Sequence, residues 1–316
     1  MKFTYIPISI RGGVLQGVDT FDHDLQGALA HNAAIYIYRG TRSKKIYIGQ
    51  TVHFLQRHKE HYNGTEEKFN AADFNQVLVV FYRGFNGFSL DDVENQLITY
   101  FNADRQKKGV GYDQDDVINR TGGNTVIEYE GREAIATDVV LPLWEEVLYP
   151  NGWVRTPTIE KLRTRALVKY SPIKKLTPEQ DDLIREVIAQ PDQSYVINGD
   201  AGTGKTVLLT HMVARILRTR KNATVGVVVQ PNWERTGREI FDIFGMKNDD
   251  RLVVATSTKL IKKGGAYDVI LVDESHKLSW RRSKQHANFN SVYKDPAYED
   301  CHSHLEICRR WGIRSS

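Results

Sequence analysis

The sequence predicts an α/β protein with two unlike modules: a small mixed α/β domain comes first, and a domain built on a parallel sheet follows. The first prediction rests on short β-rich segments near residues 34–38, 45–48 and 77–82, which surround helical stretches near residues 53–61 and 90–101. The second rests on β-branched runs that alternate with helical patterns in the second half of the chain. The 316 residues are enough for both modules.

The composition is that of an ordinary globular protein. Apolar residues make up 41% of the chain and charged residues 26%, which argues against wholesale disorder. No apolar run approaches the roughly 20 residues that a membrane helix needs, and the first residues show no secretory signal. With only two cysteines, the sequence predicts a protein of the reducing cytoplasm.

Basic residues slightly outnumber acidic ones, which gives a net charge of +4. This excess permits a polyanionic partner without requiring one. The basic residues concentrate between Arg155 and Lys175, a stretch whose only acidic residue is Glu160. A solvated linker face is the simpler interpretation of this stretch, and a strip that tracks nucleic-acid phosphates is the alternative.

Changes in composition divide the chain into four expected segments. Residues 1–30 form an N-terminal extension without a functional signal, and residues 31–125 form the first domain. Residues 126–175 are irregular and contain several prolines, so we expect a partly basic connector there. Residues 176–316 form the second domain.

Four apolar runs are the expected strands of the second domain: residues 195–198, 225–230, 252–255 and 269–272. After the first of them, residues 206–219 place apolar side chains at helical spacing. A strand, a glycine-rich loop and a helix therefore follow one another.

That loop matches the phosphate-binding pattern G-x-x-x-x-G-K-[ST] in full. Glycines let backbone N–H groups surround phosphate oxygens, and the helix N-terminus adds its positive dipole end. We expect Lys205 to contact the β and γ phosphates of ATP and the Thr206 hydroxyl to hold Mg²⁺; a glycine-rich turn without a nucleotide is the alternative. The expected nucleotide-binding residues of the loop are Gly199, Asp200, Ala201, Gly202, Thr203, Gly204, Lys205 and Thr206.

An acidic motif follows the last expected strand, where an apolar run ends in Asp273-Glu-Ser-His276. A carboxylate at a strand tip can reach the metal on the phosphate loop, and a second one beside it can polarise the attacking water. We therefore assign Asp273 to Mg²⁺ and Glu274 to water activation. An acidic surface turn is the alternative.

Together with Leu176-Thr-Pro-Glu-Gln180, these motifs resemble those of superfamily 1 helicase-type ATPases, and more narrowly those of Schlafen-type helicase-like domains of bacteria. The resemblance implies a RecA-like fold in which Gln180 reads the adenine edge. Trp233 matches a position at which such enzymes touch single-stranded nucleic acid, although a core or surface tryptophan is an equal alternative.

The resemblance also implies that a complete motor continues beyond this chain, since few residues follow His276. The missing second domain would supply the arginine finger. We therefore expect the ATPase domain to be incomplete, to bind ATP with slow or absent turnover, and to unwind no strands alone. A truncated reading frame and a second chain that completes the motor are the two explanations.

In the first domain, Ala34-Ile-Tyr36 and Tyr47-Ile-Gly49 resemble the two short motifs that name the GIY-YIG endonucleases. Ala34 stands where that family usually has glycine, and Tyr38 offers a rival register with a shorter spacing to Tyr47. Four further residues follow at the family's usual order and spacing, namely Arg57, His61, Glu94 and Asn119. The resemblance implies a DNA endonuclease that depends on Mg²⁺ or Mn²⁺.

Phosphodiester hydrolysis needs an activated water, a metal ion and cationic support for the developing charge. Glu94 supplies a hard oxygen ligand for the metal, and Arg57 can fork onto the scissile phosphate. Tyr36 is the candidate general base. Its free pKa of about 10 is too high for that role, so a neighbouring cation and the metal would have to lower it.

Three residues have supporting roles in this interpretation: Tyr47 and His61 orient water or relay the proton, and Asn119 braces the loop or the phosphate. His53 and His58 are expected at the surface or facing DNA. The alternative is that Tyr36 and Tyr47 are ordinary strand aromatics and Glu94 is a solvated helix residue.

The sequence as a whole predicts a metal-dependent DNA endonuclease joined to an ATP-binding, helicase-like module, a fusion that resembles bacterial genome-defence or mobile-element proteins. RNA remains an alternative substrate. A nucleotide-gated nucleic-acid-binding regulator with an inactive nuclease domain, or a partial helicase that uses that domain only for docking, is the alternative function.

Overall fold

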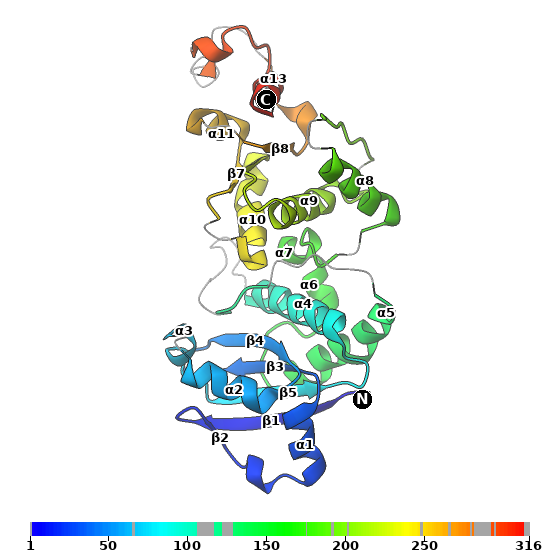
Figure 1. Cartoon of the computed structure of the whole chain (residues 1–316), viewed down its shortest axis with the longest axis vertical. Coiled ribbons are helices and arrows are strands. Elements are labelled where there is room, and N and C mark those ends of the chain that lie inside the picture. Colours follow the sequence, from blue (N-terminus) through cyan, green and yellow to red (C-terminus); the bar gives the residue numbers. More distant parts are fainter. Residues whose placement is uncertain are drawn as a thin grey trace. The chain divides into compact units, whose positions relative to one another are not determined.

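The computed structural model divides the chain into two units, Met1–Ile173 and Lys174–Ser316, whose elements are labelled in Figure 1. Each unit is described by itself. The structure describes residues 2–64, 67–105, 117–121, 129–174, 176–190, 193–200, 202–246, 249–264, 267–278, 280, 292–293 and 295–312.

Five strands form the sheet of the first unit, in the order β2-β1-β5-β3-β4, with antiparallel neighbours throughout. They are β1 (Thr4–Arg11), β2 (Val14–Leu15), β3 (Ala34–Arg39), β4 (Ile46–Thr51) and β5 (Gln76–Phe81). β3 lies between β4 and β5 and is buried almost throughout, which explains its nearly continuous apolar sequence. Residues 4–15, expected as part of an extension, supply two strands of this sheet.

The helices predicted near residues 53–61 and 90–101 are confirmed as α2 (Phe54–Asn63) and α4 (Gly87–Arg105). Figure 1 shows α2 lying over the sheet and α4 running beside β4. The remaining helices and turns are η1 (Val18–Thr20), α1 (His23–His31), α3 (Glu67–Asn70), α5 (Arg132–Ile135), η2 (Ala136–Val140), η3 (Leu143–Leu148), α6 (Ile159–Arg163) and α7 (Ala166–Lys169).

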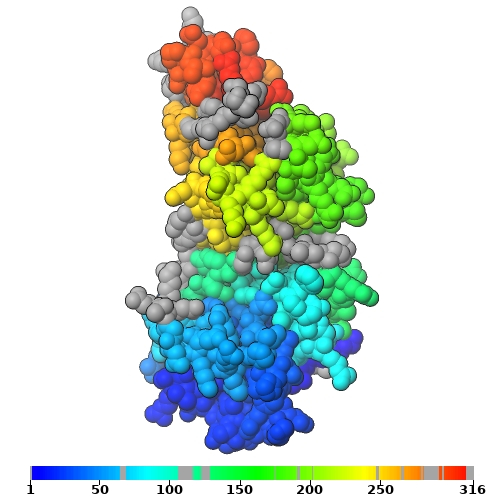
Figure 2. Space-filling view, in the orientation of Figure 1, coloured from blue at the N-terminus to red at the C-terminus, as the bar shows by residue number. Residues whose placement is uncertain are grey.

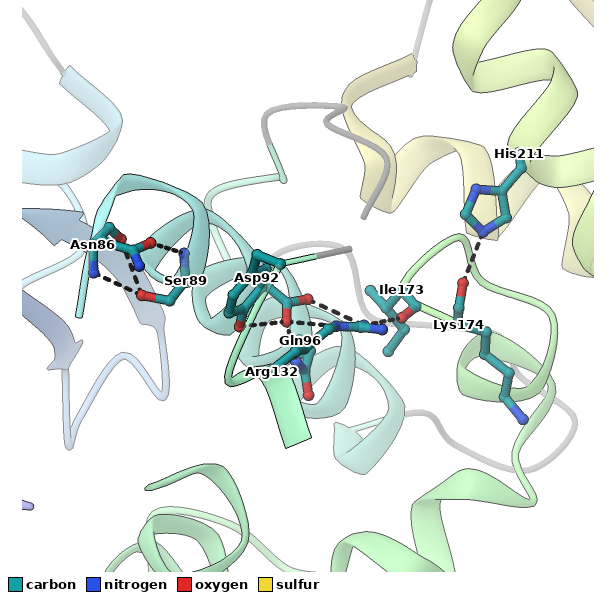
Figure 3. Close-up of polar contacts among 9 residues, drawn as sticks. Asn86, Ser89, Asp92, Gln96, Arg132, Ile173, Lys174 and His211 are labelled. Carbon is teal, nitrogen blue, oxygen red and sulfur yellow. Dashed lines mark hydrogen bonds and ion pairs between the residues drawn. The ribbon is translucent and has the colours of Figure 1, made fainter. Parts of the chain in front are cut away.

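Helix α4 is held at its start by a reciprocal cap and along its length by a buried ion pair (Figure 3). Asn86 Oδ1 accepts from the Ser89 N–H at 3.0 Å, and Ser89 Oγ accepts from the Asn86 N–H at 2.8 Å. Further along, Arg132 Nε lies 2.9 Å from Asp92 Oδ2, with side chains only 14% and 3% exposed. Gln96 also donates to this carboxylate, which leaves the buried charge well compensated.

The segment expected as a connector packs on the far end of the same helix. Asp104 accepts from the backbone N–H groups of Arg155 and Thr156 at 2.8 and 2.7 Å. The fully buried Trp144 stands edge-on to Phe101 with ring centroids 5.3 Å apart. The first unit therefore continues to Ile173, where Arg132 donates to the main-chain carbonyl.

A three-stranded parallel sheet, in the order β7-β6-β8, forms the centre of the second unit. Its strands are β6 (Val225–Val228), β7 (Leu252–Ala255) and β8 (Val269–Val272), which confirms three of the expected strands. The helices and turns are α8 (Pro178–Ala189), α9 (Lys205–Thr219), α10 (Pro231–Phe241), η4 (Asp242–Met246), α11 (Ser257–Lys263), η5 (Ser275–Lys277), η6 (Pro296–Tyr298) and α13 (His304–Gly312). In the described part of the chain, no helix has the length and apolarity to span a membrane.

The expected strand over residues 195–198 is wrong. These residues form no strand, and the Val196 side chain is 72% exposed. A strand requires a hydrogen-bonded partner, and residues 195–198 pair with none of the described strands β6, β7 and β8. A short apolar run indicates a capacity to form a strand, and it does not supply the partner.

Candidate active site

Two tyrosines, a histidine and an arginine converge where β3 and β4 meet α2. The Tyr36 hydroxyl, on β3, lies 2.9 Å from His61 Nε2, on α2. The centroid of the Tyr47 ring, on β4, lies 6.2 Å from that of the Tyr36 ring and 4.9 Å from that of the His61 ring. The Arg57 guanidinium is close enough to the Tyr36 hydroxyl to lower the pKa of the phenol. The structure thus brings Tyr36, Tyr47, His61 and Arg57 close together.

Gly49 leaves the space that the Tyr36 side chain occupies. The two residues face one another in the β3–β4 register. A Cβ atom on Gly49 would lie 2.5 Å from Tyr36 Cζ and 2.7 Å from Cε2, closer than real Cβ contacts come. Packing against Tyr36 of the first motif thus requires a glycine at position 49 in the second motif.

Gly49→Ala is expected to destabilise the protein by about 1–3 kcal/mol, because the methyl group must displace the buried Tyr36 ring. The same displacement breaks the Tyr36–His61 hydrogen bond. Urea denaturation measures the first effect. The matched control is Gly27→Ala in α1, where an added Cβ meets nothing within 4 Å; equal effects of the two substitutions would contradict the packing argument.

The buried Tyr36 hydroxyl is a neutral phenol in the free protein. Burial raises its pKa above the ordinary value, the neighbouring Tyr47 adds to the rise, and Arg57 opposes it. A neutral phenol can donate a hydrogen bond to His61 and at the same time accept a hydrogen bond from another donor. This favours a relay through the tyrosine over a stable phenolate.

Glu94 on α4 is a partly buried carboxyl group beside the tyrosine cluster. Burial raises its pKa to about 7 and the charge of Asp91 adds to the rise, whereas a hydrogen bond from Gln50 and the charge of Arg57 lower it. The carboxyl is therefore poised between its protonated and charged forms at neutral pH. The space-filling view shows that α4, in cyan, reaches the molecular surface (Figure 2).

Sequence reasoning missed two neighbours of Glu94. Gln50 Nε2 donates a short hydrogen bond to Asp91 Oδ1 and also bonds to Glu94, so one amide connects two carboxyl groups. A signal for both was present: Asp91 precedes Glu94 by three residues, which places it on the same side of a helix, and Gln50 follows Gly49 directly.

The raised pKa of Glu94 predicts a pH-dependent loss of stability. The Glu94 carboxyl has a pKa of about 7 in the folded chain, against an ordinary value of 4.5. The protonated carboxyl therefore contributes its full stability to the fold below about pH 4.5, and this contribution is lost as the pH rises through 7. In metal-free buffer, the free energy of unfolding should fall from about pH 5 to pH 8 by up to about 3 kcal/mol more for the unsubstituted protein than for Glu94→Gln. Urea denaturation at both pH values tests this, and equal pH slopes would contradict it.

Asn119 braces strand β4 between its two motif residues. Its Oδ1 accepts from the Ile48 N–H at 3.1 Å, and its Nδ2 donates to the Ile48 carbonyl. The neighbouring Ile118 N–H donates to the Ile46 carbonyl at 3.0 Å. Both ends of the Asn119 amide are thus engaged by backbone. The glycine-containing sequence that follows, residues 122–124, lies outside the described residues.

The expectation that His58 lies at the surface is wrong. His58 is only 5% exposed, and its Nδ1 lies 2.8 Å from the Tyr38 hydroxyl. The reason is helical periodicity, which turns Phe54, His58 and His61 of α2 toward the sheet. His53 precedes the helix and is exposed, with its Nδ1 lying 3.0 Å from the Ala30 carbonyl.

In the second unit, the glycine-rich loop closes around its own lysine. Lys205 Nζ donates to the carbonyls of Gly199 and Asp200 at 2.6 and 2.8 Å. Gly202 and Gly204 have φ angles of 86° and 85°, in the region that favours glycine. Thr203 and Thr206 complete the described loop at the start of α9. Ala201 lies outside the described residues.

Gln180 lies against this loop. It forms a reciprocal cap with Thr177 at the start of α8, and its Nε2 donates to the Thr203 carbonyl at 3.0 Å. The Gln180 side chain, which the resemblance places against the adenine edge, therefore connects α8 to the loop. Trp233 on α10 packs on the apolar core of this unit and against Gly237, as the core alternative predicts.

The acidic motif follows β8 and lies within electrostatic reach of the loop lysine. Burial raises the pKa of Asp273 and the neighbouring Glu274 adds to the rise, whereas Lys277 and Lys205 lower it. Glu274 has a φ of 53°, an uncommon conformation for a residue with a side chain, and its carboxylate lies 3.4 Å from His276 Nε2. Lys205 is thus close enough to Asp273 to lower the pKa of that carboxyl.

Two family models match the chain in separate places. Residues 32–108 match the GIY-YIG catalytic domain. Residues 192–304 match the Schlafen group 3, DNA/RNA helicase domain. Both resemblances stated from the motifs are confirmed. No curated protein and no solved structure gives a significant match.

Proposed function

We propose that this chain, which joins a GIY-YIG domain to a Schlafen group 3 helicase-like domain, hydrolyses phosphodiester bonds of DNA with a divalent metal ion. The observation that carries the proposal is the convergence of Tyr36, His61, Arg57 and Glu94 at one place in the first unit. These side chains are the base, cation and carboxylate that the reaction requires.

The residues around Glu94 fit Mg²⁺ or Mn²⁺. Both ions prefer hard oxygen ligands and retain several waters, and Glu94 offers such a ligand with the Asp91 carboxylate close by. The raised pKa of Glu94 indicates a carboxyl group short of positive charge, which a divalent ion would supply. When bound, the ion would polarise the phosphate and acidify a water molecule.

The protein's own groups would position the phosphate and move the proton. Arg57 is partly exposed and is steadied by Glu60 at 3.1 Å, so its guanidinium can fork onto a phosphate. Tyr36 donates its proton to His61 Nε2 as its oxygen accepts one from the attacking water. The phenol is neutral before and after the transfer, and His61 ends as the cation. Tyr47 holds the His61 ring by edge-on packing.

We assign a supporting nucleotide site to the second unit, in a RecA-like arrangement. Lys205 would exchange its two loop carbonyls for the β and γ phosphates of ATP, and Thr206 and Asp273 would hold Mg²⁺. Glu274 would activate water and Gln180 would contact the adenine. A role in genome defence or in a mobile element follows from the resemblance alone.

Cleavage of supercoiled plasmid by the purified chain tests the proposal. With Mg²⁺ or Mn²⁺ we expect nicked or linear product, and EDTA should stop its formation. Parallel reactions with and without ATP separate basal cleavage from any nucleotide effect. Binding of DNA without cleavage under every metal condition would favour the alternative, a regulator with an inactive nuclease domain.

A further inference from the structure

A second tyrosine–histidine pair lies beside the first and has no role in the proposed reaction. Tyr38 follows Tyr36 by two residues on β3, so both side chains leave the same face of the strand. His58 precedes His61 by three residues on α2, one helical turn away. The Tyr38 hydroxyl lies 2.8 Å from His58 Nδ1, and the Tyr36 hydroxyl lies 2.9 Å from His61 Nε2. Two tyrosine–histidine hydrogen bonds therefore join β3 to α2.

We propose that Tyr38 and His58 are positioning residues that fix the orientation of Tyr36 and His61 through a directed hydrogen-bond chain ending at the Gly13 carbonyl. The inference rests on the proposed nuclease function. It assigns a task to Tyr38, which the sequence offered only as a rival register, and to His58, which the sequence placed at the surface.

The direction of this chain follows from its last acceptor. His58 Nε2 lies 3.0 Å from the Gly13 carbonyl, which can only accept, so Nε2 carries the proton. Burial lowers the pKa of His58 and keeps the ring neutral. Its Nδ1 therefore lacks a proton and accepts from the Tyr38 hydroxyl. This chain anchors α2 to the turn between β1 and β2, where Gly13 has a φ of 77°.

Tyr38 supports all three aromatic side chains of the candidate site. Its fully buried ring stands edge-on to Tyr36 at 5.5 Å, to His61 at 6.0 Å and to Tyr47 at 6.3 Å between centroids. Because these rings touch one another as well, a change in the tilt of Tyr38 displaces the hydroxyl of Tyr36 from Nε2 of His61. Fixing the Tyr38 hydroxyl fixes that tilt.

The same cluster offers a matched control. The centroid of the Tyr62 ring, on α2, lies 4.8 Å from that of His58 and 5.2 Å from that of Phe69. The Tyr62 hydroxyl is buried and has no hydrogen-bond partner among the described residues. Tyr62→Phe removes a buried hydroxyl from this cluster and breaks no hydrogen bond to any described residue. Tyr38→Phe, in contrast, removes the buried hydroxyl that is hydrogen-bonded to His58.

The experiment compares both variants in the full chain. Single-turnover plasmid cleavage by Tyr38→Phe should be about five- to tenfold slower, the equivalent of one neutral hydrogen bond, with an unchanged Kd for DNA measured by anisotropy with Ca²⁺. Tyr62→Phe should cleave at the original rate. In protein labelled with ¹⁵N-histidine, the His61 ring resonances should move in Tyr38→Phe and stay in place in Tyr62→Phe.

His58→Gln tests the chain from the other side of the bond. Its amide can still donate to Gly13, whereas the acceptor at the Nδ1 position is lost, so the same selective loss of rate is expected. The effects of Tyr38→Phe and His58→Gln should be non-additive, since both remove one interaction. Folding of each variant is checked by its melting temperature, and all rates are measured well below it.

The outcomes separate this inference from the function on which it rests. If the unsubstituted protein cleaves no DNA, the proposed function fails, and the histidine resonances still report on the pair. If it cleaves DNA and Tyr38→Phe is as fast with unmoved His61 resonances, the positioning role is overturned. A weaker Kd for DNA with an unchanged cleavage rate would also overturn it, because it would place Tyr38 in substrate binding.

Discussion

Glu94→Gln is expected to abolish cleavage and to leave the protein folded. Glutamine preserves the shape of the side chain and its contact with Gln50 but removes the charge that would hold the metal. Loss of metal assistance should slow plasmid cleavage by at least about a thousandfold. Initial rates of nicking at saturating Mg²⁺ measure the effect.

The control for this substitution is Glu133→Gln, an exposed glutamate at the start of α5. It makes the same chemical change in the same unit and should cleave at the original rate. Circular dichroism confirms that both variants are folded. Cleavage by folded Glu94→Gln at the original rate would remove this residue from the proposed site.

Lys205→Ala is expected to remove nucleotide binding and to leave basal cleavage measurable. The ammonium group is the point charge that would meet the β and γ phosphates, so its loss should raise the Kd for ATP by at least about a hundredfold. Cleavage should persist because the candidate nuclease residues all lie in Met1–Ile173, whereas Lys205 lies in Lys174–Ser316. Titration with a fluorescent ATP analogue and the plasmid assay provide the two measurements.

Lys221→Ala is the matched control, since this lysine follows α9 and is exposed. It should bind the nucleotide as the unsubstituted protein does. A folded Lys205→Ala protein that loses both activities would show that cleavage requires nucleotide, which is the regulated alternative. Retention of tight ATP binding would instead remove Lys205 from the nucleotide site.

Local spacing predicts much of the candidate site. Residues three or four apart on α2, and residues that face one another across β3 and β4, share a side for geometric reasons. The motif resemblance grouped Tyr36, Tyr47 and His61, and these periodicities explain why the three side chains can meet on one side of the sheet. Glu94 joins them from a helix further along the chain, and only the motif resemblance linked it to them.

Properties that depend on distant partners could not be predicted in this way. The strand-like residues 195–198 lack the partner that their pattern requires. Residues 4–11 show no functional signal, and yet β1 pairs with β5 from much later in the chain. His58 reads as a surface residue until the sheet that covers it is known. Pattern decides which structures a segment can form, and long-range contacts decide which one it does form.

The ion pair between Asp92 and Arg132 makes the nuclease module larger than the homologous segment that identifies it. The family match ends at residue 108, while Asp92 finds its counter-charge and much of its hydrogen bonding beyond that point. Removing one partner of a buried pair typically costs about 3–5 kcal/mol, a large share of the stability of a domain. A transfer of the matched segment alone would therefore separate Asp92 on α4 from Arg132, its buried counter-charge. The compact structural unit is the whole of Met1–Ile173, and we expect recombination between residues 108 and 132 to leave the buried Asp92 carboxylate without its counter-charge.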